Sequence, residues 1–221
     1  MNATLVFLKQ VLRHQRRIGA VLPSSSFLAR EMVRGIREDG GPKRVLEVGA
    51  GTGTITRRIL AQLADGDELL IVEMEPEFVR YLEEKVLKPF RALHPGRGVT
   101  VRCAMIEDVE MDRGFGHIIC SLPFNAMPPV TVRSIFRHLL ASLAEGGELS
   151  YFAYWGQHWI QAPLIGRAGR RRLRSIRVIH GSLKRLYHGQ RRLVLWNLLP
   201  AQAVRLRPAA RPPRPLLPEA V

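Results

Sequence analysis

The sequence has few cysteines and no long apolar run. Its two cysteines, Cys103 and Cys120, fall in apolar, strand-like segments where a small buried thiol is the usual interpretation. They indicate neither a disulfide framework nor a metal site. No stretch approaches the roughly 20 apolar residues that span a bilayer. The sequence therefore predicts a protein of the reducing cytoplasm, without a transmembrane helix.

Acidic residues are scarce in the last third of the chain. After Glu148 the one acid is Glu219, against thirteen arginines and Lys184, so residues 149–221 carry +13 of the net charge of +15. Such a region implies a polyanionic partner, and both nucleic acid and an anionic membrane surface meet that description. Lysine is also scarce, at five of the 34 basic residues, so an arginine-rich proteome is an alternative source of the charge.

The length and the alternating patterns predict one α/β domain. A chain of 221 residues with 46% hydrophobic and 24% charged residues is typical of a globular protein with a sizeable core. Strand-like segments occur at 44–48, 68–73, 99–103, 116–121 and 147–154, and helix-like segments at 54–64, 76–90 and 129–144. This alternation is typical of a Rossmann-like, mostly parallel sheet with helices on both faces.

The C-terminal third departs from this alternation. Residues 174–180 and 192–198 are β-prone runs with no helix of useful length between them, so we expect them to pair antiparallel. Together with the five earlier strands they predict a seven-stranded sheet that ends in an antiparallel hairpin. Residues 41–205 then form the α/β domain, and the proline-rich segment 206–221 is a loosely packed tail.

Two helices are predicted before this domain, within residues 1–40. Residues 4–17 place apolar side chains at helical spacing and intersperse them with basic ones, which predicts a basic amphipathic helix. A second helix begins at Ser24 to Ser26 and runs to about Ile36. The basic residues of the first helix are Lys9, Arg13, Arg16 and Arg17.

A glycine-rich loop, Glu47-Val48-Gly49-Ala50-Gly51-Thr52-Gly53, follows the first strand. It opens directly into a helix, so backbone amides face the loop, and its glycines let a ligand approach the main chain closely. Glu47 is a poor neighbour for a pyrophosphate but a good one for the positively charged end of S-adenosylmethionine. Glu73 ends the next strand, 22 residues beyond Gly51, at the spacing where a carboxylate accepts both hydroxyls of a ribose.

These residues resemble the first motif of the class I S-adenosylmethionine-dependent methyltransferases. The resemblance implies that S-adenosyl-L-methionine is the cofactor, that the loop contacts its methionine part, and that Glu73 binds its ribose. It places Met74 against adenine. The loop residues concerned are Gly49, Ala50, Gly51 and Gly53. A dinucleotide-binding oxidoreductase, or a non-catalytic relative of either fold, is the alternative.

The third motif of that family departs from the expected pattern. It normally places an acid near the adenine amino group, and here Met105 aligns with that position. Ile106 follows it, and Glu107 or Asp108 is the alternative acid. A solvated acidic loop is the other interpretation of this pair.

The fourth strand runs into Ser121-Leu122-Pro123-Phe124-Asn125. This segment resembles the Asn-Leu-Pro-Tyr motif of the ribosomal RNA adenine dimethyltransferases, with Ser121 and Phe124 as differences. Serine is a poorer acceptor than asparagine for the amine of adenine. Those enzymes also carry a further RNA-binding domain where this chain has only a tail. An RNA adenine N6-methyltransferase is therefore the alternative function.

A second resemblance covers residues 5–205 and is to the bacterial phospholipid N-methyltransferases. It rests on Gly19-Ala20-Val21-Leu22-Pro23-Ser24-Ser25, on Ser121-Leu122-Pro123, and on Asn197-Leu198-Leu199-Pro200-Ala201. The resemblance implies methylation of the amine of phosphatidylethanolamine towards phosphatidylcholine. Ornithine lipid is another acceptor that the sequence leaves open.

The basic segments agree with a lipid substrate. An apolar helix face flanked by arginines, as at residues 4–18, lets an enzyme lie on a membrane, and the segment from Arg167 to Arg177 adds roughly 1 kcal/mol per charge on an anionic surface. The alternatives are a lid helix and a solvated strand edge. We therefore expect a peripheral protein on the inner face of the membrane, with no obligate protein partner.

The acceptor site is expected to align an unprotonated amine with the methyl group and to exclude water, because a sulfonium methyl is already activated. An acceptor for the amine proton would help. The candidates at its mouth are Ser121, Asn125, Tyr154, His158 and Tyr187. Tyr154 and Tyr187 are preferred for holding the headgroup, with Arg185 as a phosphate partner.

Overall fold

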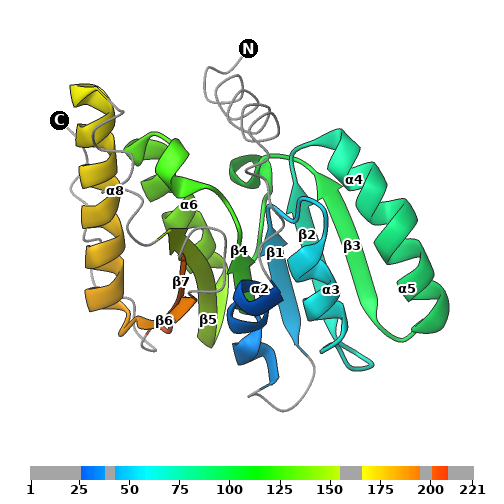
Figure 1. Cartoon of the computed structure of the whole chain (residues 1–221). Helices are drawn as coiled ribbons and strands as arrows, with labels where there is room; N and C mark the ends of the chain where they lie inside the picture. The colour runs from blue at the N-terminus through cyan, green and yellow to red at the C-terminus, as the bar shows by residue number, and fades with distance from the viewer. Residues whose placement is uncertain (1–25, 38–42, 155–165, 195–200, 209–221) are drawn as a thin grey trace.

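The computed structural model describes residues 26–37, 43–154, 166–194 and 201–208, and they contain one seven-stranded sheet (Figure 1). The strand order is β3-β2-β1-β4-β5-β7-β6. The strands are β1 (Arg44–Val48), β2 (Glu68–Glu73), β3 (Gly98–Cys103), β4 (Phe115–Cys120), β5 (Leu143–Tyr154), β6 (Gln190–Val194) and β7 (Ala201–Leu206). The first five pair in parallel, whereas β7 runs antiparallel to both β5 and β6. The predicted Rossmann-like fold is confirmed.

Helices cover both faces of this sheet. They are α2 (Ser26–Met32), α3 (Thr54–Leu60), α4 (Pro76–Leu82), α5 (Lys88–Leu93), α6 (Pro129–Ser142) and α8 (Arg167–Leu186). Shorter helical turns are η1 (Arg34–Arg37), the π-turn η2 (Glu83–Leu87), η3 (Ile106–Asp108) and η4 (Phe124–Ala126).

The two faces have separate hydrophobic cores because successive side chains of a strand point to opposite sides. In β1, Leu46 belongs to the core that α6 and α8 cover, and Val45 to the core that α2, α3 and α4 cover. The carboxyl ends of the parallel strands therefore lie between two packed layers of helices. Ligands of open α/β sheets bind at this edge.

The segment 174–180 was predicted to be a strand, and this prediction is wrong, because it lies inside α8. Its β-branched residues favour a strand locally, but Ile176, Ile179 and Leu183 are buried at helical spacing against the core. Tertiary packing outweighs local propensity here. An antiparallel C-terminal hairpin is present as predicted, but its strands are β6, which overlaps the predicted segment 192–198, and β7, which was not predicted.

Cys103 was predicted to be buried, and it is exposed, whereas Cys120 is buried as expected. The difference follows from position: Cys103 ends β3, at one edge of the sheet, and Cys120 ends the central strand β4.

Part of the predicted N-terminal unit belongs to the packed domain. Leu28, Ala29 and Met32 of α2 are buried in the core that covers one face of the sheet. The basic helix at 4–17, the Gly19–Ser25 segment, His158, Asn197 to Pro200 and the tail from residue 209 lie outside the described residues. No helix in the described part of the chain is long and apolar enough to cross a membrane.

Candidate active site

The glycine loop turns the chain from the carboxyl end of β1 into α3. Gly49, Gly51 and Gly53 have φ angles of 76°, 54° and 79°, which glycine adopts without strain. The Gly49 N–H donates to the Val72 carbonyl at 2.9 Å, so the loop is attached to the end of β2. The backbone conformation thus explains why glycine occupies these three positions.

Glu73, the last residue of β2, contacts the same loop. Its Oε2 accepts a hydrogen bond from the Gly51 N–H at 2.9 Å, and its Oε1 accepts one from the Glu75 N–H at 3.0 Å. Burial raises the pKa of Glu73, and these backbone hydrogen bonds oppose the rise. A carboxylate has about four acceptor positions. Glu73 therefore keeps acceptor capacity for the hydroxyls of a ribose.

Glu47 is completely buried on β1, just before the loop. Neither carboxylate oxygen makes a hydrogen bond of good geometry to a described residue, and burial raises the pKa of Glu47 to about 8, although the nearby Thr56 opposes the rise. A buried carboxylate without a partner is unfavourable, and a nearby cation would relieve the cost. The site therefore fits the ammonium group of a methionine part bound at the loop.

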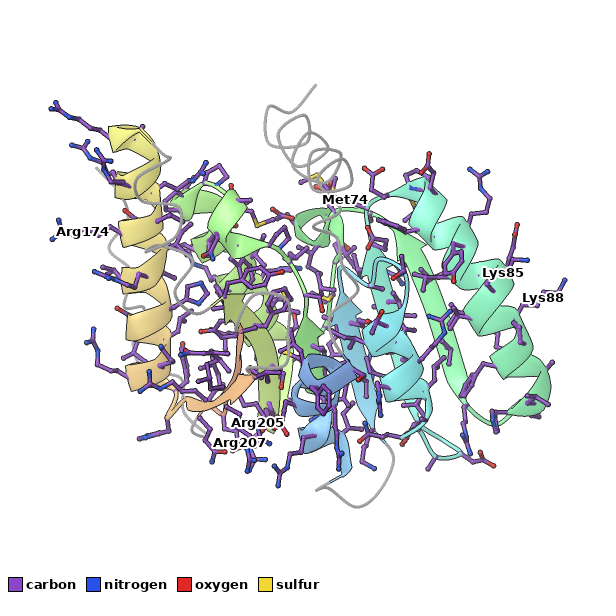
Figure 2. All side chains as sticks on the ribbon, viewed as in Figure 1. Met74, Lys85, Lys88, Arg174, Arg205 and Arg207 are labelled. Carbon is purple, nitrogen blue, oxygen red and sulfur yellow. The ribbon has the colours of Figure 1, made fainter. Side chains whose placement is uncertain are left out.

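A narrow cavity of about 30 Å³ lies beside the loop at the carboxyl ends of the strands, where Met74 is seen in Figure 2. Among its lining residues are six of those predicted to hold the cofactor: Gly49, Glu73, Met74, Met105, Ile106 and Glu107. Three methionines, Met74, Met105 and Met127, occupy much of its wall. Because methionine side chains are flexible, they can yield to a flat ring such as adenine.

Glu107 rather than Asp108 lines this cavity. Its side chain is half-buried, and burial raises its pKa. Of the two acids that the sequence left open for the adenine amino group, the geometry favours Glu107.

Ser121 connects the fourth motif to the glycine loop. Its N–H donates to the Val48 carbonyl at 2.8 Å, and its hydroxyl is buried without a partner among the described residues. A side chain added at Gly49 would come within 3.0 Å of Leu122 Cδ2. The two motifs are therefore in direct contact.

A second cavity, of about 190 Å³, lies on the other side of Leu122, which lines both cavities. It is lined by residues of η4 and its approach, of the end of β5, and of α8: Leu122, Pro123, Phe124, Asn125, Ala126, Phe152, Ala153, Tyr154, Arg172 and His180. Of the predicted acceptor residues, Asn125 and Tyr154 are here. We call this space the acceptor cavity.

Two predicted acceptor residues, Arg185 and Tyr187, are not at the acceptor cavity. Both lie at the C-terminal end of α8, where the Tyr187 carbonyl accepts a hydrogen bond from the Arg207 N–H at 3.2 Å. The same helix brings Arg172 and His180 to the cavity instead. Sequence reasoning missed this pair because it read the segment as a strand. The helical spacing of Ile176, Ile179 and Leu183 was the signal that reveals them.

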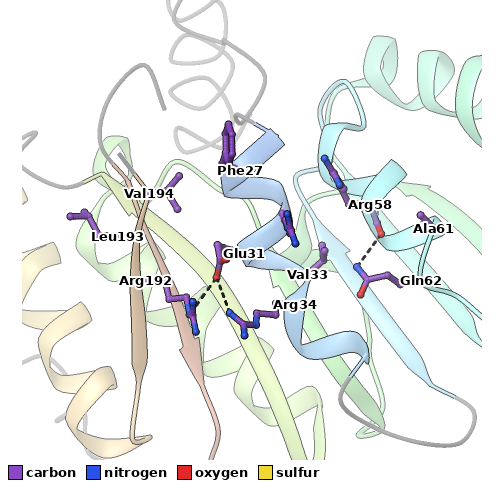
Figure 3. A pocket seen from close by; sticks show the side chains of 11 residues that line it. Phe27, Glu31, Val33, Arg34, Arg58, Ala61, Gln62, Arg192, Leu193 and Val194 are labelled. Atoms are coloured by element: carbon purple, nitrogen blue, oxygen red, sulfur yellow. Dashed lines mark hydrogen bonds and ion pairs between the residues drawn. The ribbon is translucent and has the colours of Figure 1, made fainter. Parts of the chain in front are cut away.

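A larger groove, of about 900 Å³, lies between α2, α3 and β6 (Figure 3). Glu31 on its wall forms ion pairs with Arg192 at 3.5 Å and Arg34 at 3.9 Å. None of its described lining residues lines the cofactor cavity or the acceptor cavity. The cofactor cavity and the acceptor cavity are thus separate from this groove.

Comparisons with known proteins agree with this geometry. A family model described as a methyltransferase domain matches residues 45–147. An ornithine lipid N-methyltransferase of Singulisphaera acidiphila is 29% identical over 150 residues, which cover 66% of this chain and 76% of that protein.

Solved structures share the fold. The plantazolicin methyltransferase BpumL in complex with SAH has a TM-score of 0.55 at 10% identity, over 83% of this chain and 84% of that one. A protein from Corynebacterium glutamicum has a TM-score of 0.59 at 13% identity, over 96% and 94% of the two chains.

The matched family model begins in β1 and ends in β5, and so includes the glycine loop, Glu73 and the fourth motif. The chain therefore contains a methyltransferase domain, in residues 45–147, and its cofactor is S-adenosyl-L-methionine.

Proposed function

We propose that this methyltransferase transfers methyl groups to the amine headgroup of a membrane lipid. The observation that carries the proposal is its 29% identity to an ornithine lipid N-methyltransferase across 76% of that protein. Phosphatidylethanolamine and ornithine lipid are the two candidate acceptors, and the name of this relative favours ornithine lipid. Both lipids present a primary amine near an anionic group, a phosphate in one and a carboxylate in the other.

The packing of Phe124 supports a lipid amine over an adenine base. A flipped base needs an accessible aromatic face on which to stack. Phe124 is only 3% exposed, and its ring centroid lies 4.6 Å from that of Phe136 and 5.9 Å from that of His180. A small amine requires no such face. The RNA adenine methyltransferase is therefore the weaker candidate.

The outer face of α8 supports an anionic membrane as the surface on which the enzyme works. This helix contains seven arginines and Lys184 and no acid, and Arg174 points away from the molecule in Figure 2. Its exposed arginines are Arg167, Arg170, Arg171, Arg174, Arg177 and Arg185. Each basic residue near an anionic bilayer contributes about 1 kcal/mol of binding free energy. The helix thus offers a docking face on the acceptor side of the enzyme.

The test is a methyl-transfer assay with radiolabelled S-adenosylmethionine and four substrates in parallel. These are anionic vesicles with phosphatidylethanolamine, anionic vesicles with ornithine lipid, anionic vesicles with neither, and total RNA. We expect label in the lipid fraction of one or both amine-containing vesicles. Label that appears in RNA and never in lipid would overturn the proposal. Phosphatidylethanolamine and ornithine lipid are told apart by which vesicle is labelled.

A further inference from the structure

His180 is a buried histidine whose ring nitrogens lack a hydrogen-bond partner in the part of the chain that the structure describes. Its side chain is 7% exposed, and neither Nδ1 nor Nε2 has a hydrogen-bond partner among the described residues. Buried polar groups in folded proteins are nearly always paired with protein or with water. An imidazole with both nitrogens unsatisfied at the edge of a cavity is therefore ready to bind a polar group that enters the cavity.

Aromatic rings hold His180 in place. Its ring centroid lies 5.0 Å from that of Tyr151, 5.8 Å from that of Phe136 and 5.9 Å from that of Phe124. Burial lowers the pKa of His180 to about 4, and Lys184 on the same helix acts in the same direction. The imidazole is therefore neutral near pH 7. A neutral imidazole has one nitrogen that accepts a hydrogen bond and one that donates.

Arg172 lines the same cavity from the same helix. It precedes His180 by eight residues, which is about 12 Å along a helix axis. A guanidinium stays charged at any relevant pH and matches the geometry of phosphate and carboxylate oxygens. The two residues thus place a neutral acceptor and a cation at separate points of one cavity.

Aromatic side chains form part of the wall of this cavity. Phe152 and Tyr154 line the cavity with ring centroids 5.4 Å apart, and Phe124 lines it from η4. Aromatic faces attract ammonium and methylammonium groups. Leu122 separates the cavity from the cofactor side. A small amine in this cavity would lie next to the place where the methyl group is expected.

We propose that the acceptor cavity binds a headgroup in which an amine and an anion are joined by a short linker. His180 accepts a hydrogen bond from the amine N–H, and Arg172 pairs with the anion. Arg172 and His180 are thereby assigned as substrate-binding residues, and the assignment rests on the proposed function. The shared chemistry covers both the phosphate of phosphatidylethanolamine and the carboxylate of ornithine lipid.

The reaction balances with this assignment. The ammonium releases one proton to water, and the neutral amine then binds with an N–H towards His180. Its lone pair forms the new N–C bond as the C–S bond of the sulfonium breaks, and that electron pair stays on sulfur. The products are a methylated ammonium and S-adenosylhomocysteine. His180 orients the amine and need not hold its proton, in agreement with its low pKa.

The test measures binding and activity in the same set of variants of the full chain. Calorimetry of the protein saturated with S-adenosylhomocysteine uses two probes, phosphoethanolamine and Nα-acetylornithine. We expect His180→Phe and Arg172→Gln each to weaken binding of the preferred probe at least tenfold. Arg137→Gln, at an exposed arginine of α6, is the matched control and should bind the probes normally. The tighter probe identifies the anion that Arg172 recognises.

Phenylalanine keeps the aromatic packing around position 180, and thermal unfolding and S-adenosylhomocysteine affinity establish that each variant is folded. If both variants are folded and bind the probes as tightly as the wild type, the assignment is wrong, and so it is if the wild type binds neither probe. Lipid methylation with an unchanged KM in both variants would overturn the assignment and leave the proposed function intact. Probe binding that depends on both residues, without any lipid methylation, would support the assignment and overturn the proposed function.

Discussion

The cofactor side and the acceptor side of this enzyme share Leu122 but are built in different ways. On the cofactor side, the Glu73 carboxylate accepts a hydrogen bond from the Gly51 N–H, and the Val72 carbonyl accepts one from the Gly49 N–H, near the ends of adjacent strands. On the acceptor side, the lining comes from η4, β5 and α8, which are distant in sequence. The chemistry common to the family is encoded in short contiguous motifs. On the assignment of Arg172 and His180 proposed above, the choice of substrate depends on how α8 packs.

The first way to test this contrast uses two glycines with the same backbone conformation, Gly49 (φ 76°) and Gly146 (φ 74°). A Cβ at Gly49 would lie 3.0 Å from Leu122 Cδ2, whereas one at Gly146 meets nothing within 4 Å. Alanine at either position should cost about 1–2 kcal/mol of stability. Only Gly49→Ala should also displace Leu122 and lower kcat/KM about 100-fold. Equal activity of the two variants would show that contact with Leu122 does not matter.

The second test compares surface charge on the two sides. Replacing Arg171, Arg174 and Arg177 of α8 together by glutamine should weaken binding to anionic vesicles about 100-fold, since each charge contributes about 1 kcal/mol. The matched control replaces Lys85 and Lys88, which lie on the opposite side of the molecule in Figure 2. Vesicle sedimentation gives the affinities. If each removed charge weakens vesicle binding equally in the two variants, net charge and not α8 determines membrane binding.

The third test concerns the stability of the acceptor side. The pKa of His180 is about 4 in the folded protein and 6.5 ordinarily, so between these values the unfolded state binds the extra proton. This contribution to stability is complete above pH 6.5 and is lost as the pH falls towards 4, by roughly 3 kcal/mol. Urea unfolding from pH 4 to 7 should show this loss in the wild type and not in His180→Phe. If the free energy of unfolding changes with pH in the same way in both proteins, this prediction is wrong.

The fourth test concerns a proton on the cofactor side. The pKa of Glu47 is about 8, so most of this carboxyl is protonated at pH 7. A methionine ammonium beside it would favour the charged form, and cofactor binding should release up to about one proton. Calorimetry in two buffers of different ionisation enthalpy measures this release, and Glu47→Gln should abolish it. If the wild type and Glu47→Gln release the same number of protons, the proton comes from a group other than Glu47.

The contrast also explains what the sequence could predict. The glycine loop was recognisable because three positions require the left-handed backbone that glycine adopts, and because Glu73 follows at a fixed spacing on the next strand. α8 was misread because Ile176, Val178 and Ile179 are β-branched or β-prone within a short window. The packing of its buried face against the sheet stabilises the helix, and a local sequence pattern does not include that packing energy.

The same limit explains which acceptor residues were found. Asn125 and Tyr154 were predicted because each lies just after or at the end of a recognisable strand, and such strand ends meet at one edge of the sheet. Tyr187 and Arg185 were named for their chemistry, without knowledge of the helix that carries them to the other end. The direction of one helix thus separates the residues that reach the cavity from those that do not.

The position of β7 also has a consequence for the growing chain. This strand follows all the other described strands in sequence, yet it lies inside the sheet, between β5 and β6. While the protein is being synthesised, the edge of β5 stays open until Ala201–Leu206 emerge, and an open edge invites pairing with other chains. β7 is therefore the last described strand that the sheet can add, and a nascent chain that stalls before residue 201 leaves the edge of β5 unpaired.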